Sequence, residues 1–378
     1  MSGGKIPVLF AIFCCALACA PAQSIDAAQT PPPARGLPPP ASASLVENPP
    51  SPSTFINPAS ELRTGTDLTR RGLLEEAIPH LLAAREAGAD AYATGVNLGI
   101  CYLGTGSYKK AIAQLESLRG SGHKTSAVEN LLAQAYLGDG QTGPAFQVFQ
   151  QAAAAAPKDE KLYAYMADAC TDHQDYDLGL RITDMGLRQL PGSARLHYER
   201  AVFLGRLDRF DEAKPEFDLA WKLAPESDIG YLALVQKHLY ETDLPAATRL
   251  LRQAVQSGHR DYQMLSLLGS VLLYEGAVPG QPRFAEARAA LEESARDRPG
   301  FPATQIALGK LYLREGRYKD AAAHLEEGRR LEPSNPAIYA GLARAYNGIG
   351  DRQKARNMEQ QLGRLLAEKK QLRPEPNQ

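Results

Sequence analysis

A period of 34 residues runs through most of this chain and limits its possible folds more than any other feature. Leu-Gly pairs occur at Leu98-Gly99, Leu268-Gly269 and Leu308-Gly309, and two of them have a tyrosine three residues after the glycine. A fixed period of this length is typical of repeat architectures rather than of several unrelated globular domains. Units aligned on these pairs start at Pro58, Tyr92, Ser126, Glu160, Ala194, Asp228, Tyr262, Pro302 and Pro336.

Small residues occupy fixed positions in the unit. Position 8 is glycine or alanine in eight units, with Val235 as the exception, and position 32 is proline in five. Position 20 holds eight alanines and one glycine, namely Ala77, Ala111, Ala145, Gly179, Ala213, Ala247, Ala287, Ala321 and Ala355. Small side chains at positions 8 and 20 let two helices approach closely, and a proline at position 32 ends one helix pair before the next begins. The pattern predicts a series of helix pairs.

The seventh unit has 40 residues, because six residues from Ala277 to Pro282 are inserted between its two helices. Proline and glycine in this segment exclude a helix there. Elsewhere we expect residues 58–369 to be almost wholly helical.

These positions resemble the tetratricopeptide repeat, whose pattern is W-x2-L-G-x2-Y, then A-x3-F, then P over 34 residues. The clearest copy has Leu308-Gly309 followed by Tyr312, then Ala321, Leu325 and Pro333. The resemblance covers residues 58–369 and implies an all-α fold, an α-solenoid of nine tandem helix-turn-helix units coiled as a right-handed superhelix. A single helix pair cannot bury its apolar face, so the units must stack on one another.

Some units depart from the pattern. The aromatic residue of position 4 survives only as Tyr163, Tyr231 and Tyr339, with His197 in one further unit. Arg200 stands at the usually apolar position 7 of the fifth unit, where we expect a looser or turned joint.

The first 22 residues have the three parts of a secretory signal. Lys5 supplies a positive charge, Ile6 to Ala18 form an apolar run, and Ala20-Pro21-Ala22 is a small-x-small site before Gln23. The run is shorter than the roughly 20 apolar residues that span a bilayer. A lipoprotein signal with Cys19 as the lipidated residue is the alternative, and only in that case do we expect membrane attachment.

Residues 23–57 contain nine prolines and three charged residues, a composition typical of a semi-extended, disordered linker. At the other end, residues 370–378 form a basic and polar tail. The predicted organisation is therefore signal (1–22), Pro/Ala-rich linker (23–57), repeat array (58–369) and tail (370–378).

Composition and motifs exclude several functions. Lys and Arg number 42 and Asp and Glu 43, so a strongly basic field for nucleic acid is missing. Three of five cysteines precede residue 20, and Cys101 and Cys170 read as buried thiols without metal-ligand spacing. We expect no metal and no cofactor. The repeats leave no room for a catalytic domain, so we predict no catalytic residues and no enzymatic activity.

The resemblance implies a concave groove lined by positions 2, 5, 9, 12 and 13 of each first helix. Lys310 and Arg314 are four residues apart on one such helix, and Arg344 lies 34 residues after Lys310, near Asn347. We predict that these four residues, with apolar surface from Leu273 and Tyr274, bind a partner. Its expected form is an extended peptide, acidic at one end and hydrophobic at the other. The opposing interpretation is that the cations pair with Glu315 and other local acids and only maintain solubility.

The sequence as a whole predicts an exported scaffold, periplasmic or extracellular, that binds protein or peptide partners. One alternative is a lipid-anchored structural component of an envelope assembly complex. Another is an enzyme or enzyme regulator that works with a domain on a second chain. The partner and the oligomeric state stay open at this point.

Overall fold

The computed structural model of the protein describes residues 57–371, with side chains described as far as Glu368. The predicted signal (1–22), all of the predicted linker except residue 57, and the tail beyond residue 371 lie outside the described residues. Between residues 57 and 371 every regular element is a helix. The prediction of an all-α fold built from nine helix pairs is confirmed.

The described chain forms two compact parts, each made of several repeat units, that divide after Ala169, inside helix α8 (Glu160–Asp172). The first part also contains α2 (Pro58–Arg70), α3 (Leu74–Glu86), α4 (Ala91–Gly104), α5 (Tyr108–Gly120), α6 (Ser126–Gly138) and α7 (Thr142–Ala155). The second contains α9 (Tyr176–Gln189), α10 (Ala194–Arg206), α11 (Phe210–Leu223), α12 (Asp228–Tyr240), α13 (Leu244–Gln256), α14 (Tyr262–Tyr274), α15 (Pro282–Asp297), α16 (Pro302–Arg314), α17 (Tyr318–Leu331), α18 (Pro336–Ile349) and α19 (Arg352–Gln371).

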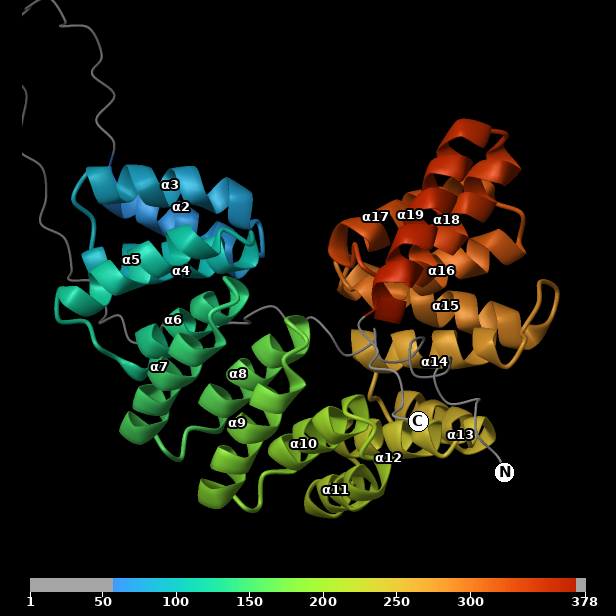
Figure 1. The fold of residues 1–378 in the computed structure, drawn as a ribbon, viewed down its shortest axis with the longest axis horizontal. Coiled ribbons are helices and arrows are strands. Elements are labelled where there is room, and N and C mark those ends of the chain that lie inside the picture. Colours follow the sequence, from blue (N-terminus) through green and yellow to red (C-terminus); the bar gives the residue numbers. More distant parts are fainter. Residues whose placement is uncertain (1–56, 372–378) are drawn as a thin grey trace, which may run out of the picture. The chain divides into compact units, whose positions relative to one another are not determined.

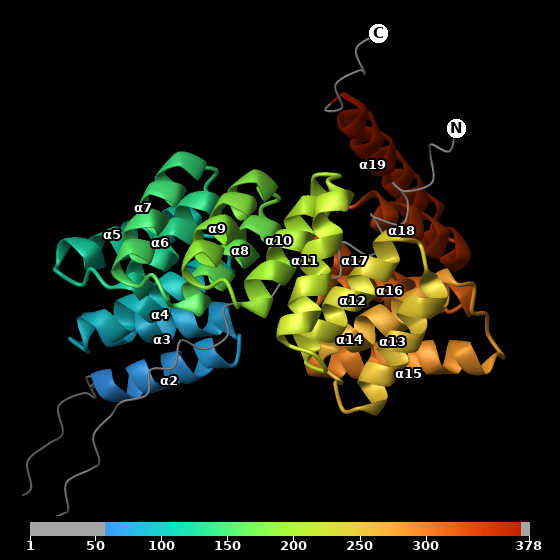
Figure 2. The ribbon, with the colours of Figure 1, turned by 90° about the horizontal axis from the view of Figure 1, so that it is seen from below.

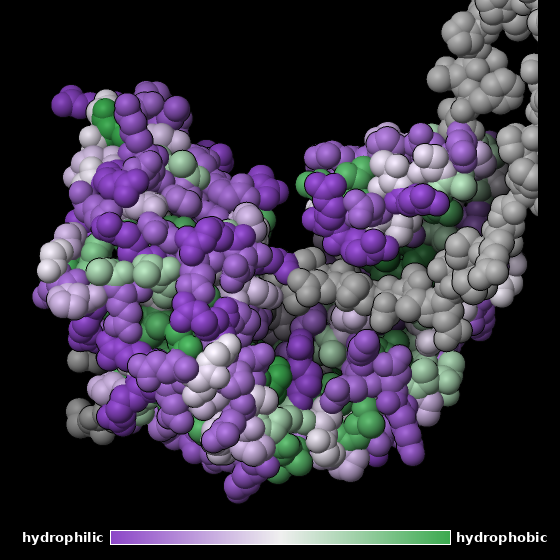
Figure 3. Space-filling view, turned by 180° about the vertical axis from the view of Figure 1, so that it is seen from behind, coloured by the Kyte–Doolittle hydropathy of each residue, from purple (hydrophilic) through white to green (hydrophobic). Residues whose placement is uncertain are grey.

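Within each of the two parts, consecutive helices lie side by side in chain order (Figures 1 and 2). The two helices of a pair contact each other, as α14 does α15 and α16 does α17. First helices also contact the first helices of neighbouring pairs, so α14, α16 and α18 form a continuous row. The face drawn in Figure 3 is mostly hydrophilic, with hydrophobic side chains in small separate patches. This row of first helices provides a continuous surface in the second part of the chain.

Close packing within a pair depends on the small residue at position 8. A Cβ added to Gly99, Gly269 or Gly309 would lie 2.8, 2.4 and 2.4 Å from the nearest atom of the leucine at position 24 of the same pair. These leucines, Leu115, Leu291 and Leu325, are fully buried. Contact between backbone and leucine therefore sets the helix separation, as the small-residue pattern predicts.

Position 20 has its own exception with a physical reason. Gly179 replaces the alanine found in the other units, and its missing Cβ would lie 2.5 Å from the ring of Phe203. Phe203 is completely buried at position 10 of the following unit. The glycine therefore makes room for an unusually large neighbour.

The joints between units explain the missing aromatic residues at position 4. The hydroxyl groups of Tyr163 and Tyr339 donate to the carbonyl oxygens of the prolines six residues earlier, Pro157 (3.0 Å) and Pro333 (2.6 Å). His197 Nε2 lies 3.0 Å from the carbonyl oxygen of Pro191, and Gln305 Nε2 donates to that of Pro299 at 2.6 Å. In these four units position 4 therefore carries a hydrogen-bonding side chain of sufficient reach, and this side chain need not be an aromatic ring.

In some units a tyrosine at position 11 connects the first helix to the second helix of the preceding pair. Tyr346 donates to Glu326 Oε1 at 2.7 Å, and Tyr136 donates to Glu116 Oε1 at 2.8 Å. Burial and the carboxylate of Glu326 raise the pKa of Tyr346 to about 12. These bonds add polar specificity to the stacking of units.

The joint at Arg200 is held by charge. Its guanidinium donates to Asp184 Oδ1 on α9 at 2.8 Å and to Glu216 Oε1 on α11 at 2.6 Å. His197 Nδ1 lies 2.6 Å from the other oxygen of Glu216. An ionic network thus occupies the position that is apolar in other units.

Gly179→Ala should lower the free energy of unfolding by about 1–2 kcal/mol, because overpacking against Phe203 outweighs the helix propensity gained. The double variant Gly179→Ala/Phe203→Leu should recover most of this loss. Gly363→Ala is the control, since nothing lies within 4 Å of its added Cβ, and it should stabilise the protein. Denaturant titrations measure all three, and a Gly179→Ala protein as stable as the parent would contradict the packing account.

Tyr346→Phe should destabilise the protein by about 1 kcal/mol near pH 8, through loss of the hydrogen bond to Glu326. The folded-state pKa lies above the unfolded value of about 10, so this contribution is complete below pH 10. It is lost as the pH rises toward 12. Unfolding titrations between pH 8 and 11 should show the two proteins converging, and a constant difference would refute the assignment.

Candidate functional site

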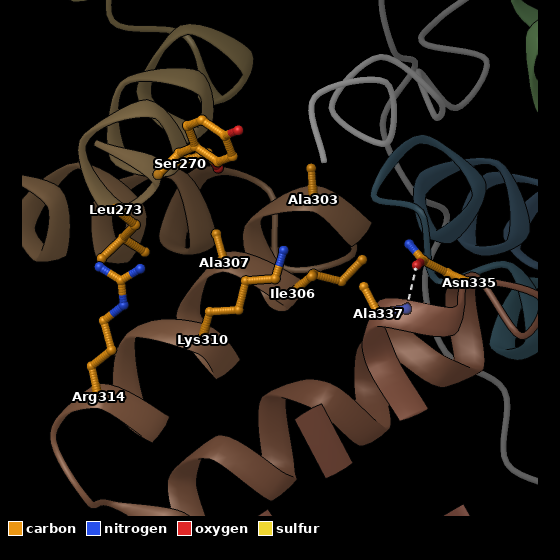
Figure 4. A pocket seen from close by; sticks show the side chains of 10 residues that line it. Ser270, Leu273, Ala303, Ile306, Ala307, Lys310, Arg314, Asn335 and Ala337 are labelled. Atoms are coloured by element: carbon orange, nitrogen blue, oxygen red, sulfur yellow. Dashed lines mark hydrogen bonds between the residues drawn. The ribbon is translucent and has the colours of Figure 1, made fainter. Parts of the chain in front are cut away.

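A hollow of about 160 Å³ lies in the second compact part of the chain, between α14, α16 and the start of α18 (Figure 4). Its side chains come from three successive first helices, which the stacking brings into one row. Four of the six predicted partner-binding residues line it. The lining consists of Ser270, Leu273, Tyr274, Ala303, Ile306, Ala307, Lys310, Arg314, Asn335 and Ala337.

The base of the hollow is apolar. Leu273, Ala303, Ile306 and Ala307 are all buried. These small and aliphatic side chains leave a concave surface that can receive an apolar group. Burying such a group from water would contribute about 25 cal/mol per Å² of apolar area.

Arg314 stands at one end of the hollow. Its guanidinium lies beside Leu273 in Figure 4, and its Nη1 donates to the carbonyl oxygen of Ala277 at 2.6 Å. Burial lowers the pKa of Arg314, and the positive charge of Arg344 lowers it further. Arginine keeps its proton at neutral pH even so. The site therefore holds two like charges that repel each other.

Lys310 lies one helical turn before Arg314 and is half-buried. Its side chain extends along α16 past Ala307 and Ile306. At the opposite side, Asn335 Oδ1 accepts from the backbone N–H of Ala337 at 3.1 Å and caps α18. The N-terminus of α18 thus faces the same region, and its dipole favours negative charge.

Arg344 and Asn347 are exposed on α18, and neither lines the hollow. Arg344 is therefore linked to the lining residues only through the effect of its charge on Arg314, whereas Asn347 lies away from the hollow. Glu315, which the opposing interpretation assigned to these cations, forms ion pairs with Arg288 and Arg317 instead. Arg344 makes no ion pair within residues 57–368.

Six lining residues were not predicted. Ser270, Ala303, Ile306 and Ala337 occupy positions 9, 2, 5 and 2 of their units, so the groove positions used for Lys310 would have included them. Ala307 and Asn335 lie at other positions. Without a charge or an aromatic ring, these residues give no signal of their own in the sequence.

The remaining polar and sulfur-containing side chains of the described residues do not form a metal or thiol site. These residues contain no group of three or more His, Cys, Asp or Glu side chains arranged to hold a metal ion. Cys101 and Cys170 are buried free thiols, as predicted, and burial raises the pKa of both. Among helices α2–α19, none combines the length and the apolar character needed to cross a bilayer.

Three segments of the chain, residues 68–135, 280–329 and 312–369, match the tetratricopeptide repeat family model. They include α16 and α18 and therefore most of the helices around the hollow. Within these segments the helix pairs are thus tetratricopeptide repeats, as the sequence pattern predicts. No curated protein matches the sequence.

Solved structures of tetratricopeptide and related proteins are similar to this chain. The APC/C hetero-tetramer Cut9–Hcn1 has 14% identity and a TM-score of 0.50, covering 81% of this chain and 60% of that one. A tetratricopeptide repeat protein from Parabacteroides merdae has 15% identity and a TM-score of 0.48, covering 68% and 98%. Yeast Tom70 has 15% identity and a TM-score of 0.39, covering 82% and 92%. At these identities the similarity concerns the fold alone.

Proposed function

We propose that this chain is a non-enzymatic protein-interaction scaffold that binds an extended peptide segment along the row α14, α16 and α18. The observation that carries the proposal is an apolar hollow with two cations, Lys310 and Arg314, in its lining, and with the charge of Arg344 acting on Arg314. Arg344 has no carboxylate partner in the described part of the chain. A ligand that brings negative charge would relieve this repulsion.

The chemistry of the lining indicates the ligand class. A carboxylate can accept two parallel N–H bonds from an arginine, the geometry that favours arginine over lysine at such sites. An aliphatic side chain fits the small apolar surface of Leu273, Ile306 and Ala307. We therefore expect a peptide with an acidic residue next to a hydrophobic one.

A protein partner also agrees with the comparisons. The Cut9–Hcn1 structure, whose fold this chain shares, is a hetero-tetramer and so holds two kinds of chain. The net charge of −1 removes the long-range attraction that many nucleic-acid-binding proteins use. Protein or peptide is therefore the partner class that we propose, without a cofactor.

Selection from a displayed library of random dodecapeptides tests the groove. On the parent protein, enriched sequences should share an acidic residue followed by an aliphatic one. The variant Lys310→Ala/Arg344→Ala should lose the acidic preference and keep its thermal transition, because charges at or near the surface contribute little to stability. Binding of a synthetic consensus peptide should weaken about tenfold or more and lose most of its dependence on salt.

The matched control is Lys222→Ala/Lys319→Ala, which removes the same charge from exposed positions on α11 and α17, outside the hollow. This control should enrich the same peptides as the parent. The groove proposal fails if the parent enriches no acidic-aliphatic consensus, or if both double variants behave alike.

We further propose that the scaffold acts after export, in the periplasm or outside the cell. The support is the order of charge, apolar run and small-x-small site in residues 1–22. The lipid-anchored component of an envelope assembly complex, with Cys19 as the modified residue, is the second candidate.

The intact mass of the protein purified from its native source distinguishes these candidates. Cleavage after Ala22 should leave a chain that begins at Gln23, because Pro21 obstructs a cut one bond earlier. A chain that starts at Cys19 and carries a lipid mass would establish the anchored form. Retention of residues 1–22 without modification would refute export.

A further inference from the structure

The six-residue insertion of the seventh unit is unnecessary for closing its helix pair. The chain reads Glu275-Gly276 before the insertion and Arg283-Phe284 after it. The eighth unit makes its turn with Glu315-Gly316-Arg317-Tyr318 and has no insertion. Removing Ala277–Pro282 would therefore leave a turn of nearly the same sequence.

The backbone shows the same equivalence. Gly276 and Gly316 both have positive φ, +90° and +72°, and their N–H groups donate to Leu273 and Leu313 at 3.1 and 3.3 Å. The next N–H groups, of Ala277 and Arg317, donate to carbonyls five residues earlier, at 3.1 and 3.0 Å. Helix α14 is thus already terminated where the insertion begins.

The insertion nevertheless has a defined shape. Ala277 is 1% exposed, and its carbonyl oxygen accepts from Arg314 in the hollow. Val278 and Gln281 close a small turn, with Gln281 N–H donating to the Val278 carbonyl at 3.2 Å and Val278 N–H to Gln281 Oε1 at 3.4 Å. Glu275 and Arg283 form an ion pair across its base. The segment is held against the end of the hollow.

In this arrangement one apolar side chain of the insertion is exposed to solvent. Val278 is 46% exposed, one of the few large hydrophobic side chains in the described chain with such exposure. It follows Leu273 and Tyr274, which line the hollow, by a few residues. The insertion carries no charge, so it extends the apolar part of the site and not its cationic part.

We propose that the insertion Ala277–Pro282 is a specificity element that contacts a second hydrophobic residue of the bound peptide. This inference rests on the proposed function. The acidic residue of the peptide lies toward Arg344, its first aliphatic residue fills the hollow, and its second packs on Val278 and Tyr274. The hydrophobic end of the peptide is the part that lies on the insertion, because the neighbouring cations bind its acidic end.

Two variants test this inference with the same dodecapeptide library. The first deletes residues 277–282 and restores the turn of the eighth unit, and the second is Val278→Ser. Val278→Ser should keep the helical content and the thermal transition, because Val278 is exposed and lies outside the helices. The deletion removes the buried Ala277 and the first residue of α15, but it restores the Glu-Gly-Arg turn of the eighth unit and should also keep the helical content. Enriched peptides should keep the acidic and first aliphatic positions but lose the preference for a second hydrophobic residue. The parent consensus peptide should bind either variant about five- to tenfold more weakly, as expected for one partly buried aliphatic side chain.

The outcomes separate the two proposals. If both variants enrich the parent consensus and bind it equally well, the insertion has no part in recognition, although the groove proposal stands. If the parent enriches no consensus, both proposals fall. Should the deletion variant not fold, the insertion is structural after all, and Val278→Ser then decides whether its side chain also contacts the ligand.

Discussion

The fold depends on the distance of closest approach within each helix pair. Where position 8 is glycine, the leucine at position 24 lies against backbone, so that no atom can be added between them. This contact fixes how the two helices of a pair cross and therefore how each pair presents its first helix to the next. Gly179 and Phe203 show that the constraint concerns total volume, because a larger side chain on one helix is matched by a smaller one on its neighbour.

Regular stacking also accounts for the composition of the site. Residues that are 34 or 40 positions apart in the chain become neighbours in the row α14, α16 and α18, so a hollow is lined by one or two turns from each helix. Apolar residues near the row support the packing, while Lys310, Arg314 and Arg344 remain at its surface. The cations are close because the repeat places them in register, and no local acid cancels Arg344 in the described chain.

Much of this could be predicted from the sequence, for a physical reason. Helix packing restricts positions 8, 20 and 24 to a few side chains, so these positions repeat visibly, and groove positions follow by counting. Lys310, Arg314, Leu273 and Tyr274 meet around one hollow as that counting implies. The bond from Arg314 to the Ala277 carbonyl was not predictable, because a backbone oxygen has no sequence signal and its direction depends on the insertion. Arg344 and Asn347, the two remaining predicted contacts, lie on α18 but do not line the hollow.

The hydrogen bonds to proline carbonyls divide the joints between units into two kinds. At Pro157, Pro299 and Pro333 a side chain of the next helix binds the loop, and proline itself limits the conformations open to the unfolded loop. At His123 and His259 the loop instead passes through Gly122 and Gly258 in the left-handed region, with the histidine ring against a tyrosine. Glycine loses more conformational entropy on folding, so these joints have the lower free energy of local opening. We therefore expect amide hydrogens beside the two glycine joints to exchange with solvent faster than those beside the proline joints.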